Sequence, residues 1–87
     1  MGVPEKVKSV IYREIQGEIV LLDPEKGKYF GLNSTGASFW DKVDGSKTVN
    51  EIVSLMAEEY DVQRDVLAVD VEELVRVLVE NGLLIMS

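Results

Sequence analysis

The chain has 87 residues, a formal net charge of −7, and neither cysteine nor histidine. This composition excludes disulfides, metal ligation by thiolate or imidazole, and acid–base catalysis by histidine. The acidic surface argues against a nucleic-acid partner, because lysine and arginine must neutralise phosphates, and it favours a basic partner. With 46% hydrophobic residues and no apolar run suited to a signal peptide or membrane span, we expect one cytoplasmic domain without a membrane partner.

The first half of the chain predicts an antiparallel meander. Residues 1–8 are polar and charged, so we expect a flexible N-terminal arm ahead of a folded domain at 9–87. Gln16-Gly17 is typical of a tight hairpin, and Asp23-Pro24-Glu25-Lys26-Gly27 predicts a turn because Pro fixes one φ angle and Gly relaxes another. The intervening runs are rich in β-branched and aromatic residues, and they predict strands at Val10–Ile15, Glu18–Asp23 and Lys28–Leu32.

The second half carries helix signals. Asn33 or Ser34 can cap a short first helix, which Asp44-Gly45 ends. Thr48-Val49-Asn50-Glu51 fits a capping box that starts a second helix, and this helix runs to about Tyr60. A third helix, from roughly Gln63 to Asn81, has a core stripe at helical spacing, formed by Leu67, Val71, Leu74, Val75 and Leu78. Three strands followed by three helices indicate an α+β fold with the helices on one face of the sheet.

The third predicted strand, Lys28–Leu32, is a candidate binding site. An outer strand of a meander leaves backbone N–H and C=O groups unpaired, and here only Lys28 guards that edge. Gly31 has no side chain, so another backbone could approach closely. We interpret the strand as an acceptor for an incoming peptide strand; the alternative is an edge covered by the C-terminal tail or by self-association. Tyr29 and Phe30 point to opposite faces, so one belongs to the core and the other can line a groove.

One strip of the third predicted helix is the second candidate. At 100° per residue its members lie beside the core stripe, and they combine exposed valines with two carboxylates that could meet a Lys or Arg of a ligand. The alternative is a wide core face with a solvated acidic margin. The strip consists of Val66, Val69, Asp70, Glu73 and Val77.

Catalysis is not expected. The paired carboxylates Glu58-Glu59 and Glu72-Glu73 are helical neighbours that point apart, and acid–base work needs two carboxylates in different environments of one cleft. The turn at residues 23–27 lacks the alternating ligands of a calcium loop. We therefore predict no catalytic residue, no metal site and no cofactor.

Two stretches of the chain resemble the PqqD-like family of recognition elements for ribosomally made, post-translationally modified peptides. They are LLDPEKGKYFGLNSTGASFWDKVDGSKTVNEIVSLMAEEYDV and DVEELVRVLVENGLL. The most specific parts, which follow one another in the family's order and spacing, are Leu32-Asn33-Ser34-Thr35-Gly36-Ala37, Asp44-Gly45, Thr48 to Ile52, Asp70-Val71 and Gly82-Leu83-Leu84. The resemblance spans about Val20 to Leu84.

The resemblance implies a winged-helix-like domain that binds the leader segment of a precursor peptide. In that family the leader adds as an antiparallel strand to the third strand and lies against the third helix. Carried onto this chain, the site comprises the backbone of Lys28–Leu32 and the strip defined above. No covalent step is implied on the chain itself.

Two subtypes of the family remain open. The segment from Asp23 to Trp40 looks like the free-standing leader-binding proteins of lasso-peptide pathways, which deliver the precursor to a separate leader peptidase of the cysteine-protease type. The alternative is a peptide chaperone of pyrroloquinoline quinone biosynthesis that serves a radical enzyme; such proteins usually have Cys before Asp-Gly, where Val43 stands here. An alternative of a different class is DNA binding by a winged helix.

Overall fold

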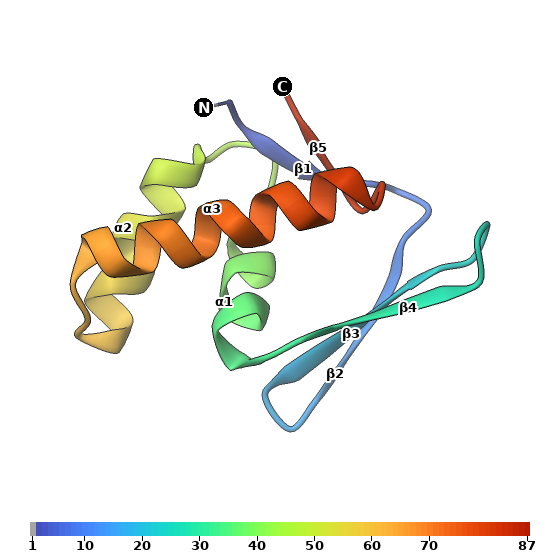
Figure 1. Cartoon of the computed structure of the whole chain (residues 1–87), viewed down its shortest axis with the longest axis horizontal. Coiled ribbons are helices and arrows are strands. Elements are labelled where there is room, and N and C mark those ends of the chain that lie inside the picture. Colours follow the sequence, from blue (N-terminus) through green and yellow to red (C-terminus); the bar gives the residue numbers. More distant parts are fainter. Residues whose placement is uncertain (1) are drawn as a thin grey trace.

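The computed structural model describes residues 2–87, and its first layer is an antiparallel sheet of three strands (Figure 1). The strands β2 (Ile11–Ile15), β3 (Glu18–Asp23) and β4 (Lys28–Leu32) are hydrogen-bonded in the order of the sequence. Their register places Val20 opposite Arg13 on one side and opposite Gly31 on the other. The predicted meander is therefore confirmed.

Both turns of the meander form for the predicted reasons. Gln16 and Gly17 adopt positive φ angles of 52° and 82°, as the two central residues of a tight hairpin require. In the second turn the Asp23 carboxylate accepts the backbone N–H of Glu25 at 3.0 Å, and the Asp23 carbonyl accepts that of Gly27 at 2.8 Å. Asp23 is thereby buried yet hydrogen-bonded, and it fixes where β4 begins.

Three helices follow the sheet: α1 (Ser34–Lys42), α2 (Val49–Tyr60) and α3 (Arg64–Glu80). The Asn33 side chain caps α1 by accepting the N–H of Gly36 at 2.9 Å. Thr48 and Glu51 form the complete capping box at the start of α2. Three strands and then three helices match the expected α+β order.

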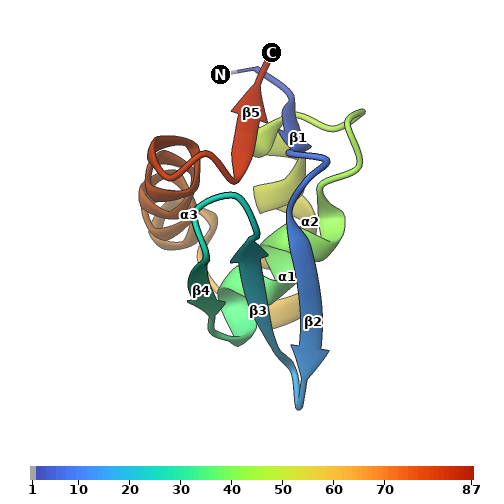
Figure 2. The ribbon, with the colours of Figure 1, turned by 90° about the vertical axis from the view of Figure 1, so that its right-hand side faces the viewer.

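The core lies between the helices and one face of the sheet. Ile19 and Leu21 of β3 and Leu32 of β4 are fully or nearly fully buried, because alternate residues of each strand face the helices. Of the predicted stripe on α3, four residues are buried, and Leu74 is the partly buried member. The opposite face of the sheet carries no helix (Figure 2).

The N-terminal segment corrects the prediction of a flexible arm over residues 1–8. Pro4–Lys6 form a strand, β1, that pairs antiparallel with β5 (Leu84–Met86) in a separate two-stranded sheet. The pairing extends to Val3, whose N–H and carbonyl each bond the backbone of Ser87 at 3.1 Å. The C-terminal strand β5 thus supplies the partner that makes the N-terminal segment ordered. Met1 lies outside the described residues.

Lys6 of β1 links the small sheet to the core. Its Nζ lies 4.9 Å from the ring centroid of Tyr12 and 5.2 Å from that of Trp40. The two rings meet edge to face, with centroids 5.6 Å apart. Trp40 is fully buried in the core.

Candidate functional site

The open edge of β4 is the principal feature of the candidate site. Within residues 2–87, β4 pairs with β3 on one side and with no strand on the other. In an antiparallel strand the N–H and C=O groups of successive residues point to opposite sides, so every second residue of β4 directs its backbone groups to the open edge. Figure 2 shows that this edge is turned towards α3. The C-terminal strand β5 pairs with β1 and does not cover it.

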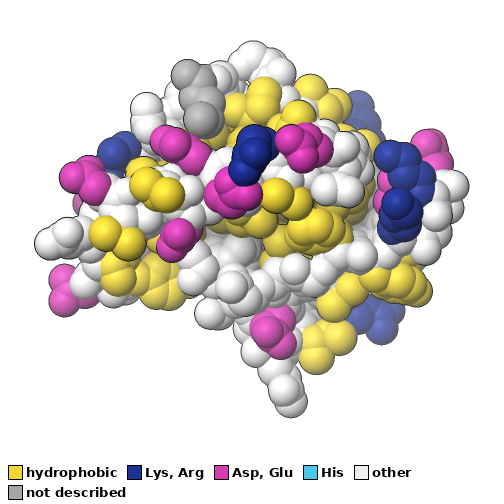
Figure 3. Space-filling model, in the orientation of Figure 1, with side chains coloured by type: hydrophobic (Ala, Val, Ile, Leu, Met, Phe, Trp, Pro, Cys, Tyr) yellow, Lys and Arg dark blue, Asp and Glu magenta, His cyan; other side chains and the backbone are white. Residues whose placement is uncertain are grey.

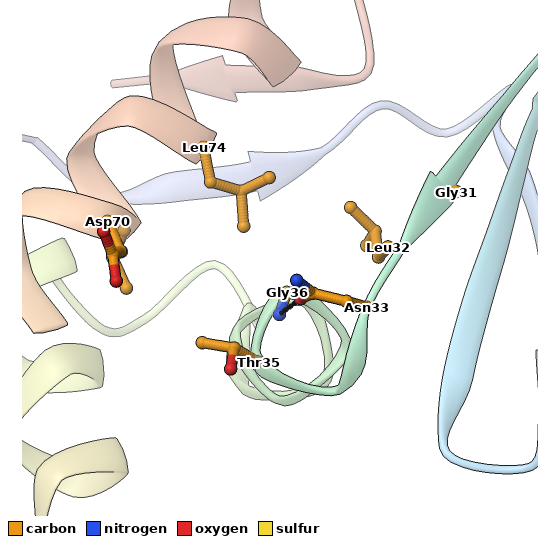
Figure 4. A pocket seen from close by; sticks show the side chains of 8 residues that line it. Gly31, Leu32, Asn33, Thr35, Gly36, Asp70 and Leu74 are labelled. Atoms are coloured by element: carbon orange, nitrogen blue, oxygen red, sulfur yellow. Dashed lines mark hydrogen bonds between the residues drawn. The ribbon is translucent and has the colours of Figure 1, made fainter. Parts of the chain in front are cut away.

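A hollow of about 420 Å³ lies between β4, α3 and the first turn of α1. Leu32 of β4 and Leu74 of α3 point into it from opposite sides, with Asp70 on the α3 wall and Thr35 at the start of α1 (Figure 4). Gly36 lets α1 approach, because a Cβ there would lie 3.3 Å from Leu32 Cβ. The hollow thus has apolar side walls and a polar margin.

A second hollow, of about 270 Å³, continues the groove towards the other end of β4. It is lined by Lys28, Tyr29 and Phe30 from the strand and by Glu80 and Asn81 from the end of α3. The N-terminal end of β4 therefore lies near the C-terminal end of α3, and the C-terminal end of β4 lies near the middle of α3. A strand added antiparallel to β4 would run in the same direction as α3, its N-terminal part beside Leu32.

The predicted strip on α3 divides into two parts. Seen from Leu74 in the groove, Asp70 and Val77 lie roughly 40° and 60° around the helix, so both belong to its groove side. Val66, about 80° away, is 60% exposed at the margin of that side. Asp70 makes no ion pair with any residue in the described range 2–87.

The other two members of the strip, Val69 and Glu73, lie on a different side of α3 from Leu74, and their role in peptide binding stays a prediction. Both line a different hollow on the far side of α3, together with Val79 and Met86. Glu73 pairs with Arg76, and its hydrogen bond and negative charge raise the pKa of the Arg76 guanidinium. Their offsets from Leu74, about 100° for Glu73 and 140° for Val69, are too large for one groove wall. Figure 3 shows hydrophobic and acidic side chains interspersed on this face of the molecule.

The structure also places Tyr29 and Phe30. Phe30 is half-buried and packs against the core on the helix side of the sheet. Tyr29 is 74% exposed and stands on the outer face. There it borders a hollow of about 350 Å³ that is mainly apolar and that the sequence did not suggest, lined by Ile11, Tyr12, Arg13, Ile15, Val20, Leu22 and Tyr29.

Across residues 2–87, no three side chains of the metal-ligating types converge to hold an ion. None of the helices in that range is both long and apolar enough to cross a membrane.

Comparison with known proteins identifies a family and three similar structures. The family model described as coenzyme PQQ synthesis protein D (PqqD) matches residues 18–84. A structure of TbiB1 in complex with the TbiA(beta) leader peptide has 32% identity and a TM-score of 0.83, covering 92% of this chain and 93% of that one. No curated protein sequence matches the chain.

Two other structures are also similar. A lasso peptide synthetase B1 complexed with the leader peptide is 26% identical with a TM-score of 0.82, covering 94% of this chain and 96% of the other. The PqqD part of Methylobacterium extorquens PqqCD, described as a functional stand-alone recognition element, is 26% identical with a TM-score of 0.80 and covers 95% and 88%. The matches thus include both pathway types that the sequence left open.

Proposed function

This chain belongs to the PqqD family, and on that premise we propose that it binds the leader segment of a ribosomally synthesised precursor peptide as an additional strand on β4. The observation that carries the proposal is the unpaired edge of β4 facing α3 across a groove. Two structurally similar proteins hold leader peptides in their complexes, which supports the same ligand class here.

The binding energy has two sources in this geometry. Main-chain hydrogen bonds to β4 contribute roughly 0.5–1.5 kcal/mol each, and they are opposed by the entropy lost when a disordered leader becomes ordered. Apolar leader side chains entering between Leu32 and Leu74 therefore decide the affinity. Asp70, at the polar margin of that hollow, pairs with a cationic leader side chain and fixes the register.

We further propose that the chain is a non-catalytic cytoplasmic protein of a lasso-peptide pathway that delivers its leader to a separate leader peptidase. By holding the leader, the domain raises the effective concentration of the cleavage site near that enzyme. Support comes from the two B1 structures, which cover 92% and 94% of this chain with TM-scores of 0.83 and 0.82.

The second candidate is a peptide chaperone of quinone-cofactor biosynthesis, favoured by the description of the family and by the PqqD structure. DNA binding finds no support among the matched structures, and the net charge of −7 opposes it. The two peptide-binding candidates differ in the precursor and the partner enzyme, not in the groove.

A titration tests peptide binding directly. The synthetic leader of the precursor encoded beside this chain, labelled with a fluorophore, should give saturable anisotropy, and a scrambled leader should not. In NMR spectra, amide shifts should concentrate in β4 and on the groove side of α3, with the exposed face of α2 as the internal control. Saturable binding without shifts in β4 would refute strand addition.

A cleavage assay tests delivery separately. The leader peptidase from the same gene cluster should cleave the full-length precursor at least tenfold faster when this chain is present. A chain that binds the leader but leaves the cleavage rate unchanged would disprove delivery and leave peptide binding intact.

A further inference from the structure

Gly31 is the one glycine that the fold of residues 2–87 does not itself require. Its φ angle lies outside the left-handed region, and a Cβ built there would meet no atom within 4 Å. The other six glycines each have an internal reason: a positive φ angle or a Cβ that would crowd a neighbouring residue. They are Gly17, Gly27, Gly45 and Gly82 in the first group, and Gly2 and Gly36 in the second.

A glycine inside a strand weakens that strand, because it has the largest backbone entropy to lose and no side chain to pack. Its usual explanation is a strained backbone or a crowded neighbour, and Gly31 has neither. The remaining explanation is a group that comes from outside the chain.

The row of residues across the sheet shows where that group would lie. On the outer face, Arg13, Val20 and Gly31 are register partners on β2, β3 and β4. The neighbouring row places Leu22 opposite Tyr29. Val20 and Leu22 are half-buried, and both line the 350 Å³ hollow on this face. The missing side chain at position 31 leaves the way from the open edge of β4 into that hollow unobstructed.

We propose that this outer-face hollow is a subsite for an aromatic side chain of the peptide strand added to β4, and that Gly31 is the gap over which the ring lies. The inference rests on the proposed strand addition. The residue of the added strand opposite Gly31 points to the same face as Val20, because side chains of paired residues share a face. An aromatic ring lying across an edge glycine is a known way to cover it.

The size of the gap selects the aromatic class. Strands are about 4.8 Å apart, so a side chain from the added strand must cross roughly 9.6 Å to stand over β3. No side chain spans that whole distance: short aliphatic side chains end near the edge of β4, whereas the larger rings of Phe, Tyr and Trp extend over Gly31 and bring their far edge towards the half-buried Val20. Arg13, on the rim of the hollow, can face the ring and contribute a cation–π contact.

The test is the substitution Gly31→Val, which fills the gap with a branched side chain suited to a strand. We expect it to raise the Tm of the free domain by a few degrees, because Val restricts the unfolded chain and favours strands. We also expect it to weaken binding of the labelled cognate leader at least tenfold. The control Glu14→Val adds the same branched residue at an exposed position of a strand, β2, that lines neither the groove nor the outer-face hollow, and it should change affinity less than threefold.

A second measurement identifies the side chain. Alanine substitution along the leader should reveal one aromatic position whose loss weakens binding to the wild-type domain at least tenfold but weakens binding to Gly31→Val less than threefold. Val20→Ala should weaken binding through that same leader position. Such coupling shows that the ring and the gap interact.

Each outcome is decisive. If wild type and Gly31→Val bind the leader with equal affinity, the proposed subsite is wrong. A lower Tm of Gly31→Val would also overturn it, because the domain's own fold would then require Gly31. The absence of any position coupled to Gly31 in the leader would also overturn it. If the wild-type domain fails to bind the leader at all, the proposed function itself fails, a result visible before any variant is compared.

Discussion

Proline substitutions at Tyr29 and Phe30 of β4 probe strand addition most directly. Proline removes one backbone N–H and leaves the rest of the strand in place. Because adjacent residues of an antiparallel strand direct their N–H groups to opposite sides, one of these two donors bonds β3 and the other faces the open edge. The two variants should therefore fail in different ways, and Gly31→Pro should behave like Tyr29→Pro.

The magnitudes separate the two cases. Loss of the N–H that bonds β3 leaves a buried carbonyl of β3 without a hydrogen bond and lowers the free energy of unfolding by about 1–3 kcal/mol. That is a large part of the total free energy of unfolding, roughly 4–13 kcal/mol, expected for a domain of this size. Loss of the edge donor leaves the free domain's hydrogen bonds intact. In the complex, however, this substitution leaves a carbonyl of the leader without its hydrogen bond. The same cost of about 1–3 kcal/mol then appears as a loss of binding affinity of about 5- to 150-fold.

Urea denaturation and fluorescence anisotropy measure the two effects on the same samples. We expect one proline variant with reduced stability and another with near-native stability and weakened leader binding. If the variants at 29, 30 and 31 that remain folded all bind the leader as tightly as wild type, backbone pairing at β4 is not the mode of recognition.

Three further substitutions test the groove, the helix cap and the small sheet. Val77→Asp should weaken leader binding at least tenfold by anisotropy, whereas Val69→Asp, on the far side of α3, should stay within twofold; equal effects would remove α3 from the groove. Thr48→Ala should lower the free energy of unfolding by about 1 kcal/mol. The backbone N–H of Thr48 and, second, its side-chain hydroxyl lower the pKa of Glu51, and the alanine removes only the hydroxyl. The stabilisation that depends on the hydroxyl and on ionised Glu51 exists above the unfolded-state pKa and disappears as pH falls. The deficit in urea melts should therefore be larger at pH 7 than at pH 3, and an equal deficit would contradict it. Lys6→Met should cost about 0.5–1 kcal/mol in the same melts by removing the cation from two aromatic rings, and no loss would make that contact incidental.

Local signals predicted the elements whose determinants lie within a few residues. The box formed by Thr48 and Glu51 places the start of α2, and the turn at Asp23 places the start of β4. Asn33 caps α1 through a bond to the residue three positions on. Each of these devices satisfies backbone groups by its own side chain, so its outcome depends little on the rest of the fold.

The pairing of β1 with β5 could not be predicted in this way. Each strand has three residues, and the partner of Glu5, Ile85, lies at the opposite end of the sequence. A segment this short has no alternation to detect, and a polar N-terminal stretch resembles a solvated arm. Its order depends on a partner from the opposite end of the chain.

The candidate site was predictable as an edge but not as a complete groove. Alternation along residues 28–32 established that one face and one edge would be exposed, yet only tertiary structure assigned Phe30 to the helix side and Tyr29 to the outer face. On α3, helical spacing fixes angles between side chains but not the direction in which β4 lies. For that reason one predicted strip is divided in the structure: Asp70 lines the groove, whereas Val69 and Glu73 line a hollow on the far side of α3.

The antiparallel contact between Val3 and Ser87 holds the two ends of the described chain side by side. A domain with adjacent termini can be inserted into a surface loop of a larger enzyme with little strain on its core. For the same reason it can be circularly permuted, with its termini joined and new termini placed in another loop. In such a fusion the paired strands β1 and β5 would connect the domain to the host protein, and the open edge of β4 would stay accessible to a peptide.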